Sequence, residues 1–158
     1  MSSDASPGDG AAIRRPGTLD HLPALVEFVR EACARSGADA SSCFALRLAV
    51  EEVCINLMRH AYPGGEPGPI EVSVSGDAGR LVVTITDFAP PFSPEEAPSP
   101  DLDGSWEERR IGGLGWHLVK SVVDEVRYEA RAGAGNRLTL VKRTEAAGRG
   151  AEGERWKS

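Results

Sequence analysis

Two polar residues in one apolar stretch have the types and spacing that phosphate chemistry uses. Glu52 and Asn56 lie four residues apart in SSCFALRLAVEEVCINLMRHAY, residues 41–62. On a helix this interval places them one turn apart on the same side. A carboxylate can act as a general base, and an amide oxygen can help to bind a Mg²⁺ ion held by phosphates. The alternative, for any Glu and Asn at this spacing, is an ordinary solvated pair.

The stretch that carries them predicts a helix of about five turns. Ser41 or Ser42 can cap its start, and Pro63 ends it. Projection at about 100° per residue places apolar residues on two sides of the helix. One side is a narrow stripe of Leu46, Val50, Val53, Leu57 and Ala61. The opposite, broader side carries Phe44, Leu48, Ile55 and Met58. We therefore expect a helix buried on two sides, where a carboxylate and an amide need polar partners or a cleft. His60 suits a helix cap, and we assign it no catalytic role.

A third polar residue, Asp87, is expected at the exit of a core strand. Residues 70–75 and 81–86 alternate around Gly76-Asp77-Ala78-Gly79 and predict an antiparallel hairpin whose second strand is the more buried. The prolines that follow Phe88-Ala89 cannot continue a strand ladder, because they lack an N–H donor. The strand should therefore end at Asp87.

A glycine cluster, Gly113-Leu114-Gly115, opens directly into an apolar-periodic helix that runs to about residue 124. Helix N-termini bind anions, and glycines let a phosphate approach the backbone, although a short glycine loop alone is a weak signal. The connection before it, residues 90–110, is long enough to be a lid over a ligand or a plain surface insertion. Arg109 and Arg110 could reach a terminal phosphate, or could form a mixed-charge surface with the glutamates beside them.

The remaining segments complete one predicted domain over residues 11–143. A first helix runs from near Leu19 to Arg35, and residues 126–131 and 137–143 form a second hairpin around Gly133-Ala134-Gly135-Asn136. We expect a two-layer α/β sandwich, with helices that start near Leu19, Ser42 and Gly115 on one face of a mainly antiparallel mixed sheet. Residues 1–10 and 144–158 have the composition of a disordered tail and a flexible charged tail.

Composition narrows the function classes. A chain of 158 residues has room for one well-packed domain. Its net charge of -6 argues against non-specific binding to nucleic acid or anionic membranes. Cys33, Cys43 and Cys54 lack the spacing of a zinc site or disulfide framework and are expected to be reduced core residues. The sequence has neither a membrane span nor a secretory leader pattern, which predicts a cytoplasmic protein.

Taken in order, the three polar segments resemble the GHKL ATPase family, which includes gyrase-type topoisomerases, heat-shock chaperones, histidine kinases and mismatch-repair ATPases. EEVCINLMRHAY and IGGLGWHLVKSVVDEV are most similar to the anti-sigma factor serine/threonine kinases. The resemblance covers roughly residues 12–143. It implies that Glu52 is the general base, that Asn56 binds Mg²⁺ and that Asp87 bonds the adenine amino group. It also implies that the loop of Gly113, Leu114 and Gly115 wraps the triphosphate.

One departure from the family pattern follows Asp87. The family has x-Gly-x-Gly at that point, whereas this chain has Phe88-Ala89-Pro90-Pro91. A methyl group at Ala89 and a fixed φ at Pro91 narrow the nucleotide side of the loop, so a lower affinity for nucleotide is expected.

The function implied by the resemblance is that of an ATP- and Mg²⁺-dependent serine/threonine protein kinase. It would phosphorylate an anti-sigma factor antagonist and sequester a sigma factor. A second hypothesis is a partner-binding module of the same fold with weak or no nucleotide binding, which the missing glycines favour. A third, a detached histidine-kinase catalytic domain, is disfavoured because no helical segment with a phospho-accepting histidine is visible. The sequence leaves open whether the chain forms a homodimer.

Overall fold

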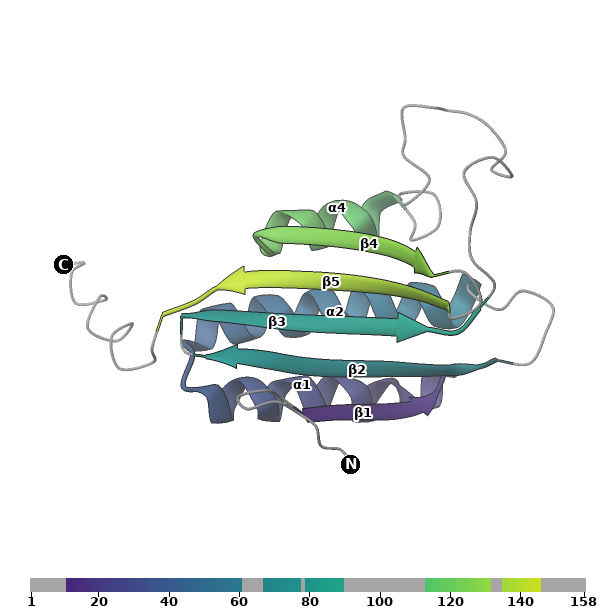
Figure 1. The fold of residues 1–158 in the computed structure, drawn as a ribbon, viewed down its shortest axis with the longest axis horizontal. Helices are drawn as coiled ribbons and strands as arrows, with labels where there is room; N and C mark the ends of the chain where they lie inside the picture. The colour runs from purple at the N-terminus through teal and green to yellow at the C-terminus, as the bar shows by residue number, and fades with distance from the viewer. Residues whose placement is uncertain (1–10, 61–66, 78, 90–112, 132–134, 146–158) are drawn as a thin grey trace.

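The protein is a two-layer α/β sandwich, in which helices cover one face of a five-stranded sheet (Figure 1). The computed structural model describes residues 11–60, 67–77, 79–89, 113–131 and 135–145. The strands are β1 Ala11–Pro16, β2 Pro69–Asp77, β3 Arg80–Asp87, β4 Glu125–Arg131 and β5 Gly135–Arg143. The helices are a short 3-10 turn, η2 Leu19–His21, and α1 Leu22–Ser36, α2 Ala40–His60 and α4 Gly113–Val122.

The sheet has the order β1-β2-β3-β5-β4, and all four pairings are antiparallel. The two hairpins expected from alternating sequence patterns, β2-β3 and β4-β5, both form. Because side chains alternate between the two faces of a strand, Ile85 and Asp87 share the helix-facing side of β3. Register places Asn136 of β5 directly beside Asp87 at the end of the two central strands.

Helix α2 lies in the middle of the helix layer, between α1 and α4, and also contacts β3 and β5. Pro23 is tolerated in α1 because it lies in the first turn, and Gly37, with φ 83°, caps the C-terminus of α1. The core is formed by apolar side chains of all three helices and the central strands, including Leu25, Val29, Leu46, Val50, Val53, Ile70, Val83, Ile85, Val119 and Leu140. These packing contacts confirm the predicted fold class.

The structure differs from the sequence-based expectations at β1, α2 and α4, and β5 begins at Gly135 and not at residue 137. Strand β1 is not predicted by the sequence pattern, because Ile13 is its only large apolar residue; it is held by pairing with β2 at the sheet edge. The expectation that α2 is buried on two sides is wrong at Phe44, whose side chain is 54% exposed. Helix α4 begins at Gly113, two residues before the expected start.

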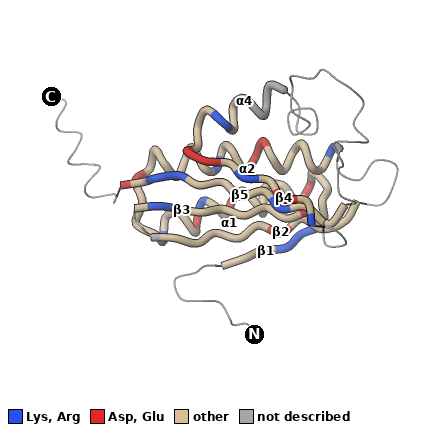
Figure 2. Tube along the Cα trace, turned by 45° about the horizontal axis from the view of Figure 1, so that its top comes forward, with Lys and Arg blue, Asp and Glu red and all other residues tan. Residues whose placement is uncertain are grey.

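Several expectations lie outside the described residues: the two tails before residue 11 and beyond residue 145, the 90–110 connection, and Arg109 and Arg110. In the part that is described, basic and acidic residues are interspersed along the elements (Figure 2). None of the described helices combines the length and apolar character needed to cross a membrane.

Candidate functional site

Four segments that carry the sequence motifs meet at one end of the molecule (Figure 1). They are the C-terminal half of α2, the end of β3, the start of β5 and the start of α4. The antiparallel order of β3 and β5 brings the end of one strand beside the start of the other. The fold therefore collects polar residues that are far apart in the sequence.

Glu52 and Asn56 lie on α2 as expected, both partly buried. Asn56 Nδ2 donates a hydrogen bond to the backbone carbonyl of Glu52, 2.9 Å away. This bond engages the amide nitrogen with the helix backbone and leaves Oδ1 as the acceptor atom of the side chain. An amide oxygen can bind a cation or accept a hydrogen bond from a donor.

Asp87 is buried at the end of β3, with 3% of its surface exposed. Its Oδ1 accepts hydrogen bonds from the backbone N–H of Ala89 at 3.0 Å and from Nδ2 of Asn136 at 2.9 Å. The hydroxyl of Tyr128, on β4, donates to Oδ1 of Asn136. Asp87, Asn136 and Tyr128 thus form a chain of hydrogen bonds across three strands, which holds a carboxylate in an interior where an unpartnered one would be costly.

Gly135 allows the hydrogen bond between Asn136 and Asp87 to form, because the backbone of β5 passes very close to Asp87 at this position. Its φ is 87°, and a Cβ at this position would lie 2.0 Å from the carbonyl oxygen of Asp87. An L-residue with a side chain would meet both backbone strain and overlap. The glycine is therefore required by the approach of β5 to the end of β3.

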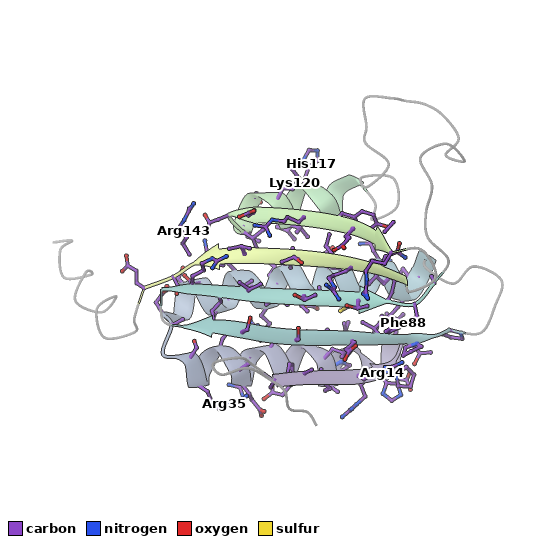
Figure 3. The ribbon with its side chains drawn as sticks, in the orientation of Figure 1. Arg14, Arg35, Phe88, His117, Lys120 and Arg143 are labelled. Carbon is purple, nitrogen blue, oxygen red and sulfur yellow. The ribbon has the colours of Figure 1, made fainter. Side chains whose placement is uncertain are left out.

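The two residues after Asp87 differ in burial. Ala89 is 2% exposed and belongs to the hydrophobic core, while Phe88 is 38% exposed. The guanidinium of Arg14, on the edge strand β1, lies 4.7 Å from the centre of the Phe88 ring (Figure 3). The methyl group of Ala89, which the sequence placed on the nucleotide side of the loop, is thus packed into the interior.

The glycine cluster opens a helix, as predicted. Gly113, Leu114 and Gly115 form the first residues of α4, so that the N-terminal backbone of this helix lies at the same end as Asp87. A helix N-terminus carries a partial positive charge and backbone N–H groups without helical partners. Arg110, which precedes it, and the side chain of His60 lie outside what the structure describes.

The donor set suits a hard cation shared with phosphates better than a protein-only metal site. Within the described ranges, no three His, Cys, Asp or Glu side chains gather as metal ligands. Mg²⁺ commonly takes one or two protein oxygens and completes its shell with phosphate oxygens and water. The amide oxygen of Asn56, on the same helix face as the Glu52 carboxylate, fits such a site.

The cysteines contribute no nucleophile to this end of the molecule. Burial raises the pKa of the Cys33 and Cys54 thiols to about 12, so both are neutral near pH 7. Both are fully buried, as expected, whereas Cys43 is only partly buried and lies near the other end of α2.

Sequence reasoning missed Asn136 and Tyr128. Asn136 follows three Gly and Ala residues, a composition that predicts a hairpin turn, but β5 begins at Gly135 and includes it. The signal that could have identified it is the second hairpin itself. Extending that strand by two residues places Asn136 opposite Asp87 in the register.

Comparisons with known proteins agree with the fold and with the family resemblance. Residues 16–142 match the family model described as a histidine kinase-like ATPase domain. The serine/threonine-protein kinase BtrW of Bordetella bronchiseptica is 30% identical over 98 residues, covering 62% of this chain and 68% of that protein. The serine-protein kinase RsbW of Listeria monocytogenes is 31% identical over 117 residues, covering 67% and 74%.

A solved structure supports the fold. The crystal structure of the RsbU and RsbW domains of a Mycobacterium tuberculosis protein superposes with a TM-score of 0.61 at 23% identity. The match covers 85% of this chain and 32% of that longer one. The chain therefore belongs to the histidine kinase-like ATPase domain family and, within it, to the group of the RsbW serine-protein kinases, as the sequence motifs indicated.

Proposed function

We propose that this chain is an ATP-dependent serine/threonine protein kinase that acts as an anti-sigma factor. It would phosphorylate a serine or threonine of an anti-sigma factor antagonist and sequester a sigma factor when the antagonist is phosphorylated. The names of the relatives support the reaction class. The observation that carries the proposal to this chain is the Glu52–Asn56 pair on one face of α2, with the amide nitrogen of Asn56 engaged by the 2.9 Å bond and its oxygen left as the acceptor.

In the proposed reaction, Glu52 accepts the proton of the substrate hydroxyl while the oxygen of that hydroxyl attacks the terminal phosphorus of ATP. The bond between that phosphorus and the bridging oxygen breaks, and ADP leaves. Mg²⁺, when bound with ATP, would offset the negative charge of the phosphates. Asn56 would hold the ion through Oδ1, without itself exchanging a proton.

The other residues position the nucleotide. Asp87 would accept a hydrogen bond from the adenine amino group, with Asn136 and Tyr128 holding the carboxylate in place. Gly113, Leu114 and Gly115 would present backbone N–H groups to the phosphates at the start of α4. Arg110 would reach the terminal phosphate from the preceding segment.

A second candidate is a partner-binding module of the same fold that has lost strong nucleotide binding. It is favoured by Ala89, which stands where the family has glycine and is packed in the core with its N–H bonded to Asp87. A loop fixed in this way has less freedom to adapt to a purine. The two candidates differ in what they predict for ATP.

Calorimetric titration with ATP and Mg²⁺ separates the candidates. We expect saturable binding by the parent chain and at least tenfold weaker binding by Asn56→Ala, which loses the proposed ion ligand. Arg59→Ala, on the same helix and exposed, is the matched control and should bind like the parent. Absence of binding by the parent at millimolar ATP would reject the kinase and favour the partner-binding module.

A further inference from the structure

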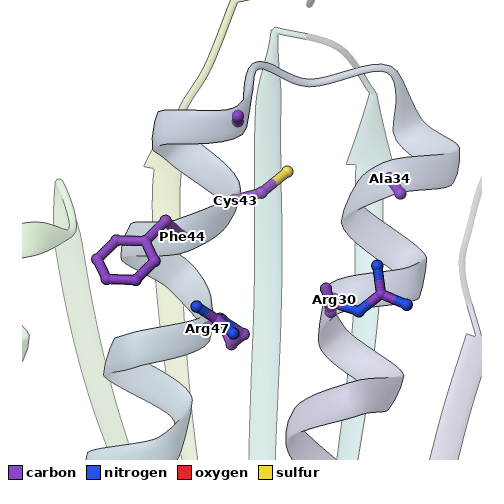
Figure 4. A pocket seen from close by; sticks show the side chains of 6 residues that line it. Arg30, Ala34, Cys43, Phe44 and Arg47 are labelled. Atoms are coloured by element: carbon purple, nitrogen blue, oxygen red, sulfur yellow. The ribbon is translucent and has the colours of Figure 1, made fainter.

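A groove lies between α1 and α2 at the end of the helix layer remote from the candidate site (Figure 4). It has a volume of about 310 Å³ and faces away from the sheet. Six residues line it, two from α1 and four from α2: Arg30, Ala34, Ala40, Cys43, Phe44 and Arg47. The volume is at the small end of the range for ligand pockets, and suits one large side chain.

The lining of the groove suits an aromatic group. Ala34, Ala40 and Cys43 present small apolar groups, and Phe44 exposes about half of its surface in the same place. The guanidinium of Arg47 lies 5.1 Å from the centre of the Phe44 ring, so a cation and an aromatic face are already stacked together. Arg30, on the opposite side, is held by an ion pair with Glu27. Aromatic rings pack on such surfaces through both stacking and cation–π contact.

The chain just after β5 is held beside this groove by hydrogen bonds. The backbone N–H of Glu145 donates to Oδ1 of Asp39 at 2.9 Å, and the N–H of Asp39 donates to the carbonyl of Glu145 at 2.8 Å. Asp39 immediately precedes Ala40, which lines the groove. The chain beyond residue 145 therefore starts next to the groove, at a point fixed by two hydrogen bonds.

We infer that Trp156 of the C-terminal segment occupies this groove, stacked on Phe44 and Arg47. Residues 146–158 read AAGRGAEGERWKS, and Trp156 is the one large apolar side chain among them. It follows Glu145 by eleven positions, a chain length that spans up to about 36 Å when extended. A tether of this length gives an effective concentration of about millimolar, so a contact of modest intrinsic strength is sufficient.

The occupied groove would cover the Cys43 thiol, which supplies a direct measurement. Cys33 and Cys54 are fully buried, so Cys43 is the thiol that a reagent can reach in the folded chain. Burial raises the pKa of Cys43, and labelling with iodoacetamide is therefore best done at about pH 8.5. Disappearance of the reactive thiol in Cys43→Ala confirms the assignment.

The test compares the rate of Cys43 labelling in the parent chain and in Trp156→Ala. We expect labelling to be about fivefold faster in Trp156→Ala, because protection scales with the fraction of time for which the groove is covered. Trp156→Phe should retain most of the protection, since it keeps a ring. Trp106→Ala, which removes an indole from another segment, is the matched control and should label like the parent.

A double-mutant cycle ties the effect to this groove. In a Phe44→Ala background, where the stacking surface is absent, replacing Trp156 by Ala should no longer change the labelling rate. Equal rates for the parent and Trp156→Ala would overturn the inference and leave the groove to another occupant. Protection that grows as protein concentration rises from about 1 to about 100 µM would also overturn it, because a second copy would then cover the groove.

Discussion

The two ends of α2 differ in the kind of side chain that they bury and the kind that they expose. Toward its C-terminus, Asn56 is bonded to its own backbone, and the Asp87 network lies below it in the sheet. Toward its N-terminus, Phe44 and Arg47 are stacked at the surface. Polar groups are held inside at one end, and an apolar ring is held outside at the other. Each end departs from the usual distribution of residue types, and such departures accompany binding sites.

The difference also shows how each end is fixed. Asp87 and Asn136 are aligned by the register of the two central strands, which many backbone hydrogen bonds maintain. The groove is shaped by the packing of two helices, and Asp39, just before α2, is hydrogen-bonded to Glu145, two residues after the end of β5. We therefore expect substitutions at the first end to have large effects on chemistry and stability, and substitutions at the second to have smaller ones.

The largest expected effect concerns Glu52. If it is the general base, Glu52→Gln should lower phosphate transfer from labelled ATP to an antagonist protein by about 10²- to 10⁴-fold. ATP affinity should change little, because Asn56 and Asp87 remain. Glu51→Gln, one position earlier on α2, is the control and should transfer at the parental rate. Parental transfer by Glu52→Gln would show that this carboxylate is an ordinary helix residue.

Gly135 and Gly37 provide a matched pair of glycines at opposite ends. Both have a positive φ, 87° and 83°, but a Cβ at Gly135 would overlap the backbone of Asp87, whereas nothing lies within 4 Å at Gly37. We expect Gly135→Ala to lower the free energy of unfolding by about 3 kcal/mol or more, and Gly37→Ala by about 1 kcal/mol. Urea denaturation of both variants measures the difference. Equal losses would mean that β5 can move away from Asp87 without cost.

The hydrogen bonds of Asp87, Asn136 and Tyr128 should contribute more to the free energy of unfolding than the stacking of Arg47 on Phe44. Asn136→Ala removes a donor from Asp87 and the acceptor of the Tyr128 hydroxyl, which should cost about 1–3 kcal/mol of unfolding free energy. Tyr128→Phe, which removes one bond, should cost about 1 kcal/mol. Arg47→Ala at the groove should lie within about 0.5 kcal/mol of the parent. A larger loss for Arg47→Ala than for Asn136→Ala would reverse the comparison.

The smallest expected effect depends on pH and belongs to the groove end. Burial raises the pKa of the Asp39 carboxyl, but hydrogen bonds to the backbone of Glu145 and Ser42 outweigh this and leave it below its usual value. A depressed folded-state pKa stabilises the protein above the unfolded value, about 3.9, and this contribution is lost as pH falls through the folded value.

Asp39→Asn tests this dependence, because its stability cannot respond to that ionisation. The stability advantage of the parent over Asp39→Asn should be constant from pH 7 to about pH 5 and should shrink below about pH 4. Thermal unfolding of both chains across this range measures it. An advantage that persists unchanged at pH 3 would contradict the assignment.

Much of the fold and of the candidate site could be predicted because apolar residues recur at regular intervals along the helices and strands. The stripe of α2 and the alternation of β2 and β3 are periodic, and this periodicity assigns Glu52, Asn56 and Asp87 to their elements. Strand β1 could not be found in this way, since Arg14, Arg15 and Pro16 give no alternation. Its position depends on pairing with β2, which only the folded chain supplies.

Asn136 and Phe44 escaped prediction for a different reason. A glycine-rich run marks a turn, and the sequence does not show that the turn ends before Asn136. For Phe44, helical projection identifies apolar positions but not whether a neighbouring element covers them. The groove forms because Ala34 and Ala40 are too small to fill the space beside the ring. Register and side-chain volume are properties of pairs of segments, and a single sequence reports them weakly.

The strand order has a consequence for the chain as it is being synthesised. Among the strands that the structure describes, β5 is made last, yet it is inserted between β3 and β4 and completes the centre of the sheet. Until residue 143 has left the ribosome, β3 remains an edge strand, and its apolar residues Leu81, Val83 and Ile85 lack half of their pairing partners. Exposed apolar edges are sites of aggregation and chaperone recognition. Nascent chains that stop before residue 135 should accordingly remain sensitive to protease and bound to chaperones, whereas release of the final hairpin should make the domain resistant within one cooperative step.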